Sequence, residues 1–232
     1  MLADRKKRTF YSEWAYVLGV LTLAIGTALM ERADFGMSMV VAPAYLIHLK
    51  VSQYLPWYSF GISEYFFQAF LIIVLSIVLR RMKLGYLFSF VTAVIYGTIL
   101  DLSMTAIGYL SFSGILARVV FFVVGVLFCS MGVSFLFHTY ISPEAYELVV
   151  KEVTSKYKKN ITKVKTIYDC TSCLVGILLS FLFFGLWHFQ GVNVGTVITA
   201  IVNGWLIGRF GKFWESHYNF RDGLKWRQFF EK

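Results

Sequence analysis

Charged residues are scarce in this chain. Only 15% of its 232 residues are Asp, Glu, Lys or Arg, whereas 58% are hydrophobic and 19% are aromatic. A soluble domain carries about 25% charged residues and at most about 50% apolar ones. The mean hydropathy of +0.66 points the same way. The composition excludes an ordinary soluble protein and predicts an integral membrane protein whose single domain lies mostly in lipid.

Several chemical signatures are also missing. The three cysteines are an odd number and lie within or beside apolar runs, which argues against a disulfide framework. Cys170 and Cys173 form a CxxC pair without a second pair or a nearby histidine, so packing explains them better than a metal or redox site. The sequence has neither a glycine-rich phosphate loop nor a nucleophile elbow. We therefore expect no enzyme activity, no cofactor and no metal.

Acidic residues are fewer than basic ones, 13 against 22, which gives a net charge of +9. The basic residues occur in blocks between apolar runs, which is the pattern of the positive-inside rule rather than of a nucleic-acid surface. These blocks are residues 5–8, 80–83, 151–165 and the stretch from 209 onward. An even number of crossings with both termini in the cytoplasm places all four blocks on one side. Anionic lipid headgroups are the expected partner there.

Six apolar runs approach the roughly 20 residues that a membrane-spanning helix needs. No small-residue cleavage site follows the first run, so it is a retained helix rather than a signal peptide. We expect spans at about 14–30, 62–79, 87–109, 115–137, 164–186 and 194–208, with a turn at 187–191. The remaining ends are a basic cytoplasmic segment, 1–13, and an interfacial, basic and aromatic cytoplasmic tail, 210–232.

Two shorter segments follow the first and fourth runs. Residues 35–47 are apolar but too short to cross a membrane, and Pro43 interrupts them, so we expect an interfacial or re-entrant segment. From Ser142 onward, apolar residues recur at helical spacing with lysine and glutamate opposite them. We interpret this second segment as an amphipathic helix at the cytoplasmic surface, with Ser142 as its N-cap and Pro143 in its first position.

The two halves of the chain resemble each other. Gly26 in the first run pairs with Gly132 in the fourth, and Gly97 pairs with Gly204 at almost the same spacing. Halves of three helices each have opposite orientations in a membrane. The prediction is an all-α integral membrane protein with six transmembrane helices as a 3+3 inverted repeat, a plan known among transporters. Chance similarity between apolar helices is the alternative. The proposed repeats are residues 14–109 and 115–209.

Small residues and polar motifs recur along both halves. They lie at 26–30, 32–38 and 97–101, and then at Gly132, 142–144, Asp169 and 195–196. On these residues the chain resembles the YitT/YczE-type family of bacterial integral membrane proteins from about Val17 to Arg209. The resemblance implies a six-helix bundle in the bacterial cytoplasmic membrane and a role in transport. It implies no catalytic or ligand residues.

Charged side chains inside a membrane are costly, so they usually face a cavity or a partner. Glu31, Arg32 and Asp34 follow the first run and form either an ion pair or proton site at a cavity mouth, or charges at the outer interface. Asp101 has sixteen uncharged residues on either side. It is expected to serve a cavity, or to form a structural salt bridge with Arg32 or Arg118.

Other polar groups interrupt the later helices. Glu64 and Gln68 lie four apart on one helix face, where Glu64 is interpreted as a first-turn cap and Gln68 lies deeper. Asp169 follows Lys165 by about one turn at a helix entry, and Asn203 needs a hydrogen-bond partner in its helix. The candidate substrate-binding residues are Glu31, Arg32, Asp34, Ser38, Gln68, Asp101, Ser142, Asp169 and Asn203.

The sequence favours a small-solute secondary transporter whose polar site lies between the two repeats. A substrate-binding membrane subunit of an ATP-driven transporter has a similar size and helix number, and the basic segment 151–165 is then its docking surface. A non-transporting interaction or assembly protein is the third hypothesis. The solute is not identified, and a homodimer or a partner subunit is compatible with all three.

Overall fold

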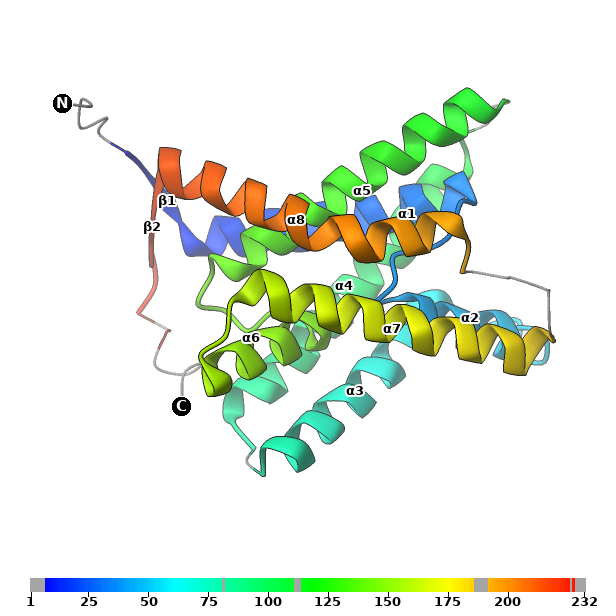
Figure 1. The fold of residues 1–232 in the computed structure, drawn as a ribbon, viewed down its shortest axis with the longest axis horizontal. Coiled ribbons are helices and arrows are strands. Elements are labelled where there is room, and N and C mark those ends of the chain that lie inside the picture. The colour runs from blue at the N-terminus through cyan, green and yellow to red at the C-terminus, as the bar shows by residue number, and fades with distance from the viewer. Residues whose placement is uncertain (1–6, 81, 111–113, 186–191, 226, 228–232) are drawn as a thin grey trace.

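A computed structural model describes residues 7–80, 82–110, 114–185, 192–225 and 227. Along the chain its elements are β1 (Arg8–Tyr11), α1 (Ser12–Ala33), α2 (Ala42–Val51), α3 (Phe60–Leu79), α4 (Leu84–Gly108), α5 (Ile115–Phe137), α6 (Ala145–Tyr157), α7 (Ile161–Phe184), α8 (Val194–His217) and β2 (Tyr218–Arg221) (Figure 1). Six of the described helices, all except α2 and α6, are long and apolar enough to cross a membrane. The protein is therefore a multi-pass membrane protein.

The predicted spans coincide with these six helices, with differences at their ends. α7 begins at Ile161 rather than 164, because the Asn160 side chain accepts hydrogen bonds from the backbone of Thr162 and Lys163 and caps the helix there. α8 continues to His217, well beyond the predicted end at 208. Charged side chains mark where a helix leaves the apolar layer, but they do not end it. The turn expected at 187–191 lies outside the described residues.

The central contact of the bundle joins α1 to α5 through glycines. A Cβ atom on Gly26 would lie 2.7 Å from the backbone nitrogen of Cys129, and one on Gly132 would lie 2.7 Å from the carbonyl oxygen of Gly19. Backbones this close leave no room for a side chain. Because Gly19 faces Gly132 and Gly26 faces Gly125, the two helices are antiparallel.

The two short helices begin in the protein interior and each packs between α3 and α7. In α2, Pro43 lies in the first turn, where a missing N–H costs nothing, so it starts the helix rather than interrupting it. α6 begins at Ala145, and its first residues are buried. Ser142 and Pro143 precede the helix, so their predicted roles as N-cap and first position are wrong. The predicted surface location is wrong for the first half of α6.

The links that lead into these short helices are held by hydrogen bonds from two other helices. The backbone N–H of Gly195, at the start of α8, donates to the Phe35 carbonyl over 2.9 Å. On α4, the Ser89 hydroxyl donates to the Pro143 carbonyl over 2.6 Å, and the Thr92 hydroxyl donates to the Ser142 carbonyl over 2.8 Å. α8 thus secures the link before α2, and α4 secures the link before α6.

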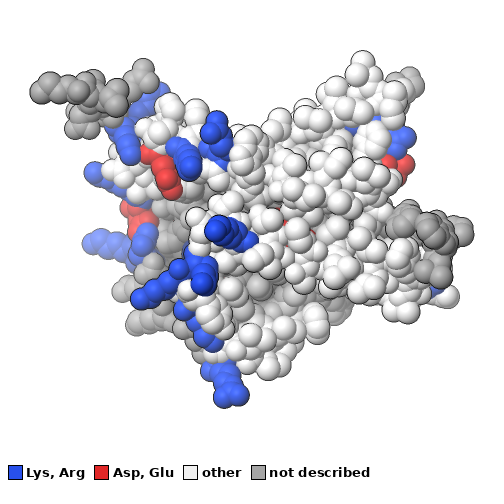
Figure 2. Space-filling model, in the orientation of Figure 1, with Lys and Arg blue, Asp and Glu red and all other residues white. Residues whose placement is uncertain are grey.

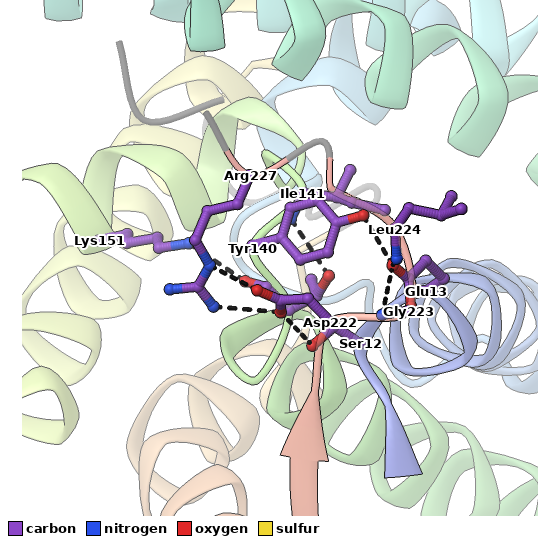
Figure 3. A network of polar contacts seen from close by, with 10 residues as sticks. Ser12, Glu13, Tyr140, Ile141, Lys151, Asp222, Gly223, Leu224 and Arg227 are labelled. Carbon is purple, nitrogen blue, oxygen red and sulfur yellow. Dashed lines mark hydrogen bonds and ion pairs between the residues drawn. The ribbon is translucent and has the colours of Figure 1, made fainter. Parts of the chain in front are cut away.

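The described ends of the chain meet at one end of the molecule. β1 and β2 pair in parallel, with Arg8 opposite Tyr218. Beside them, the Glu13 carboxylate accepts hydrogen bonds from the Tyr140 hydroxyl over 2.7 Å and from the backbone N–H of Leu224 over 2.9 Å (Figure 3). The first turn of α1, the residues after β2 and the link between α5 and α6 are therefore joined in one polar network. Lys and Arg side chains gather at this same end, and the middle of the visible face is almost free of charge (Figure 2).

Candidate functional site

The first part of the site joins α3 to the start of α6. Glu64 and Gln68 are one turn apart on α3 and both are buried. The Gln68 amide nitrogen donates to Glu64 Oε2 over 3.0 Å and lies 3.4 Å from Glu144 Oε2. Gln68 Oε1 accepts the backbone N–H of Ala145 over 2.9 Å, and the Tyr146 hydroxyl donates to Glu64 Oε2 over 2.9 Å. Side chains of α3 therefore satisfy the first turn of α6 inside the bundle.

The second part joins α6 to α7. Lys165 Nζ lies 3.0 Å from Glu147 Oε1 and 3.0 Å from Asp169 Oδ1, one turn further along α7. Asn203 of α8 is close enough to interact with the Asp169 carboxylate. The Asn203 amide oxygen in turn accepts a hydrogen bond from the Ser130 hydroxyl of α5 over 2.7 Å. Polar side chains thus connect four helices through the interior.

We call Glu64, Glu144, Glu147, Asp169 and Lys165 the acidic cluster. Each of these side chains belongs to a residue that is at most 2% exposed. The cluster contains four carboxyl groups and one lysine, so full ionisation would bury a large excess of negative charge at a cost of several kcal/mol per ion. Protons are the simplest compensation, because a buried carboxyl group escapes this cost by staying neutral.

Two further observations agree with bound protons. Burial, together with the carboxylates of Glu147 and Glu64, raises the pKa of Glu144 well above its usual range. Glu64 Oε1 and Glu147 Oε2 are buried without a hydrogen-bond partner among the residues that the structure describes. An unsatisfied buried carboxylate oxygen is where a proton or a bound ligand would be stabilised. Within the described part of the chain, no group of three or more His, Cys, Asp and Glu side chains is placed to hold a metal ion.

A cavity reaches this cluster from the end of the molecule that carries β1 and β2. Its volume is about 340 Å³, and it lies between the last turns of α5, the first turns of α7 and the second half of α8. The polar or small residues that line it include Ser134, His138, Thr162, Lys165, Gly211 and Glu215. Lys165 is the one residue of the acidic cluster in this lining, so the lysine separates the cavity from the carboxyl groups.

The structure brings four of the predicted site residues to this region. Gln68 and Asp169 are direct members of the network, and Asn203 extends it to α8. Ser142 is buried on the link just before Glu144, where its carbonyl, rather than its hydroxyl, accepts the bond from Thr92. Gln68, which looked deeper than Glu64, is indeed at the centre, but Glu64 is buried as well and does not cap its helix. Ser59 is the N-cap of α3.

The other predicted residues lie apart from the cluster, near the far end of α1. The Glu31 carboxylate accepts a hydrogen bond from the Tyr45 hydroxyl over 3.3 Å. Asp34 is exposed and pairs with Arg118 over 2.9 Å. The exposed Arg32 donates to the Leu110 carbonyl over 3.1 Å. The Ser38 hydroxyl is buried against the Met39 sulfur. These contacts close the end of α1 and enclose no cavity that the structure describes.

Asp101 has a role that neither sequence hypothesis contained. Its Oδ2 accepts the Ser59 hydroxyl over 2.7 Å, and its Oδ1 accepts the Gly61 backbone N–H over 2.9 Å. It therefore completes the N-terminal cap of α3 from the neighbouring helix, where a negative charge is favoured by the helix dipole. The described contacts include no ion pair from Asp101 to Arg32 or Arg118.

Sequence reasoning missed Glu144, Glu147 and Lys165 as site residues, because all three belong to a segment whose charges read as a solvated surface. A signal was nevertheless present. Glu144 and Glu147 are three apart and therefore share a helix face, and Lys165 precedes Asp169 by four residues on the next helix. An acidic face on one helix and a lysine–aspartate pair on its neighbour are complementary if the two helices pack together.

The comparisons with known proteins place the chain in a family without a known activity. The chain belongs to DUF6198, a family of unknown function, whose model matches residues 10–212. No curated protein matches the chain, and no solved structure matches it. The family match does not test the resemblance to the YitT/YczE-type proteins, which stays a prediction.

Proposed function

We propose that this member of DUF6198 is a proton-coupled secondary transporter of a small solute. One observation carries the proposal: four buried carboxyl groups lie with a single lysine, which contacts two of them, at the point where α6 begins inside the bundle. Ionisable groups inside membrane proteins mark proton and substrate pathways, because their burial is too costly to be kept without a use. Their protonation state is the quantity that a pH gradient can drive.

The packing supports two halves related as an inverted repeat. α1 packs on α4 as α5 packs on α8, and α3 packs on α6 as α7 packs on α2. Each half has the order long, short, long, long, and the antiparallel contact of α1 with α5 lies where a two-fold axis would run. Alternating access would then move one half against the other around the site.

The charge distribution supports an orientation. The basic end of the molecule, which carries β1 and β2, is assigned to the cytoplasm by the positive-inside rule. Anionic lipid headgroups are the partner that this end would meet. With the family resemblance, this places the protein in the cytoplasmic membrane of a bacterium, with both termini inside. The cavity beside Lys165 then opens to the cytoplasm.

The test is solute-dependent proton movement by the purified protein in liposomes that contain a pH-sensitive dye. A panel of small anions, cations, zwitterions and neutral solutes is added outside, and the expected result is proton flux with one class. Glu64→Gln and Glu144→Gln should abolish this flux. The matched control is Glu152→Gln on α6, because Glu152 contacts Lys83 and Tyr86 outside the acidic cluster. Flux that survives both cluster variants, or no flux with any class, would contradict the proposal.

The two alternative functions give different results in the same assay. An ATP-driven transporter subunit moves no solute without its ATPase, and an assembly protein moves none at all. Proton-coupled flux by the purified protein alone would exclude both.

A further inference from the structure

The cavity beside Lys165 is lined by basic and hydroxyl groups and by one described carboxylate, Glu215, which pairs with His138 over 3.3 Å. Glu147 and Asp169 lie behind the lysine and are absent from the described lining. The lining includes the buried residues Lys165 and Ser134, and the Ser134 hydroxyl has no hydrogen-bond partner among the described residues. A buried cation and a buried hydroxyl without a partner are donors for an anionic ligand.

The size of the cavity limits the ligand. A volume of about 340 Å³ is near the lower end of ligand pockets, which run from roughly 300 to 1,000 Å³. Small residues make this space, because Gly204, Gly208 and Gly211 of α8 all line the cavity. A Cβ atom on Gly211 would lie 3.5 Å from the His138 ring and 3.7 Å from the Ser134 hydroxyl, so a large side chain at that position would fill the cavity.

The negative charge around Lys165 exceeds the positive charge of its ammonium group. Two carboxylates contact one ammonium group, and the Tyr168 ring lies 5.7 Å from Lys165 Nζ. The other titratable or charged groups on the elements around these three side chains are Glu64, Glu144, Cys129, His138, Lys212 and Glu215. We call Lys165, Glu147 and Asp169 the triad. With both carboxyl groups ionised, the triad has a net charge of −1 and repels an anion. Each proton that it takes up removes one negative charge beside the lysine.

We propose that the cavity binds a small monocarboxylate through Lys165, and that protonation of Glu147 and Asp169 frees the lysine to bind it. Two protons and one monoanion change the charge of the triad from −1 to 0, so the loaded site is electrically neutral inside the bundle. A single buried lysine matches one negative charge, which favours a singly charged anion such as a monocarboxylate over a doubly charged one. The inference names the solute class of the proposed transporter and rests on that function.

The experiment measures the binding of acetate, lactate, inorganic phosphate and choline to the purified full-length protein by the shift of its unfolding temperature. Acetate and lactate are expected to stabilise the protein at acidic pH, and their apparent Kd should rise by roughly tenfold per pH unit for each linked proton above the titration range. Stabilisation by choline or by phosphate alone, or binding of monocarboxylates that does not change with pH, would overturn the inference.

Two variants test the mechanism directly. The double variant Glu147→Gln with Asp169→Asn keeps Lys165 and removes both competing charges, so it should bind lactate at alkaline pH as tightly as the wild type does at acidic pH. Gly211→Leu should abolish binding by filling the cavity, whereas Gly108→Leu, whose position is open, should not. Lactate binding that survives Gly211→Leu would overturn the inference. So would lactate binding by the double variant at alkaline pH that is weaker than binding by the wild type at acidic pH.

The outcomes separate this inference from the proposed function. Proton flux driven by another solute class, without monocarboxylate binding, overturns the inference and leaves the transporter. Monocarboxylate binding without proton flux supports the ligand class and overturns coupled transport.

Discussion

The helices α2 and α6 pack against the same two helices and differ in chemistry. Both are short, both begin in the interior and both pack between α3 and α7. The first turn of α2 is Ala42, Pro43 and Ala44, and its main polar contact with α3 is a 2.6 Å hydrogen bond from the Ser63 hydroxyl to the Ala44 carbonyl. The start of α6 has two buried glutamates instead, Glu144 just before the helix and Glu147 in its first turn.

The comparison shows that this fold can hold a short helix in its interior without buried charge. α2 does so with small apolar residues alone. The acidic cluster is therefore not needed to keep α6 in place, and a buried ion pair contributes little net stability compared with apolar packing. Its retention points to a function, and the following predictions test this asymmetry in order of decreasing effect.

The largest effect is expected for Lys165→Met. This change leaves Glu147 and Asp169 buried without their cation, so it should destabilise the protein by about 3–5 kcal/mol. The matched control is Lys50→Met in α2, because Lys50 contacts the Phe183 carbonyl over 3.4 Å and the Phe184 ring, and no ion pair from it is found among the described residues. Thermal unfolding in detergent measures both. Equal losses of stability in the two variants would contradict the expected difference between a lysine that pairs with buried carboxylates and one that does not.

If the two halves form the proposed inverted repeat, the glycine contacts between α1 and α5 should respond equally to substitution in either helix. Gly26→Ala and Gly132→Ala each place a Cβ atom 2.7 Å from a backbone atom of the other helix, so each should cost about 1–3 kcal/mol through overpacking. Gly108→Ala is the control, since nothing lies within 4 Å of its Cβ position. Unfolding temperatures that fall for only one of Gly26→Ala and Gly132→Ala would indicate that the halves are not equivalent there.

The pH dependence of stability should follow Glu144. Its pKa is raised by burial and by neighbouring carboxylates, so the folded protein binds this proton more tightly than the unfolded chain does. The resulting stability is present at pH below the ordinary glutamate value of about 4.3 and is lost as the pH rises through the folded-state pKa. Glu144→Gln should flatten this decline, and the control variant Glu152→Gln, outside the acidic cluster, should leave it unchanged. An unchanged slope in Glu144→Gln would count against a protonated cluster.

The smallest effect is expected for Asp101→Ala. The side chain caps α3, so its loss should cost about 1 kcal/mol of stability. Proton-coupled flux should remain close to wild type, whereas Asp169→Asn should abolish it. Loss of flux in Asp101→Ala at full protein yield would indicate that the transport site lies near the start of α3, around Asp101, rather than at the acidic cluster.

The sequence predicted the six long helices well, because their apolar runs and flanking charges are local properties. It also placed Gln68, Asp169 and Asn203 among the candidates, since polar residues within apolar runs stand out. It could not place α6, because the same amphipathic pattern suits a helix on a membrane surface and one inserted with its acidic face against a buried lysine. Asp101 stood out for the same reason as Asp169, and only the packing separates a cap from a member of the cluster.

The pairing of β1 with β2 has a consequence for assembly. The Ser12 and Asp222 side chains, 210 positions apart, meet beside this two-stranded ribbon. The two strands can pair only after all the helices between them have been synthesised and inserted into the membrane. Their pairing is therefore a late step of assembly rather than a starting point for folding. In a chain whose insertion stops before α8, β1 would remain an unpaired strand. Such a strand can pair with a strand of another incomplete chain and lead to aggregation.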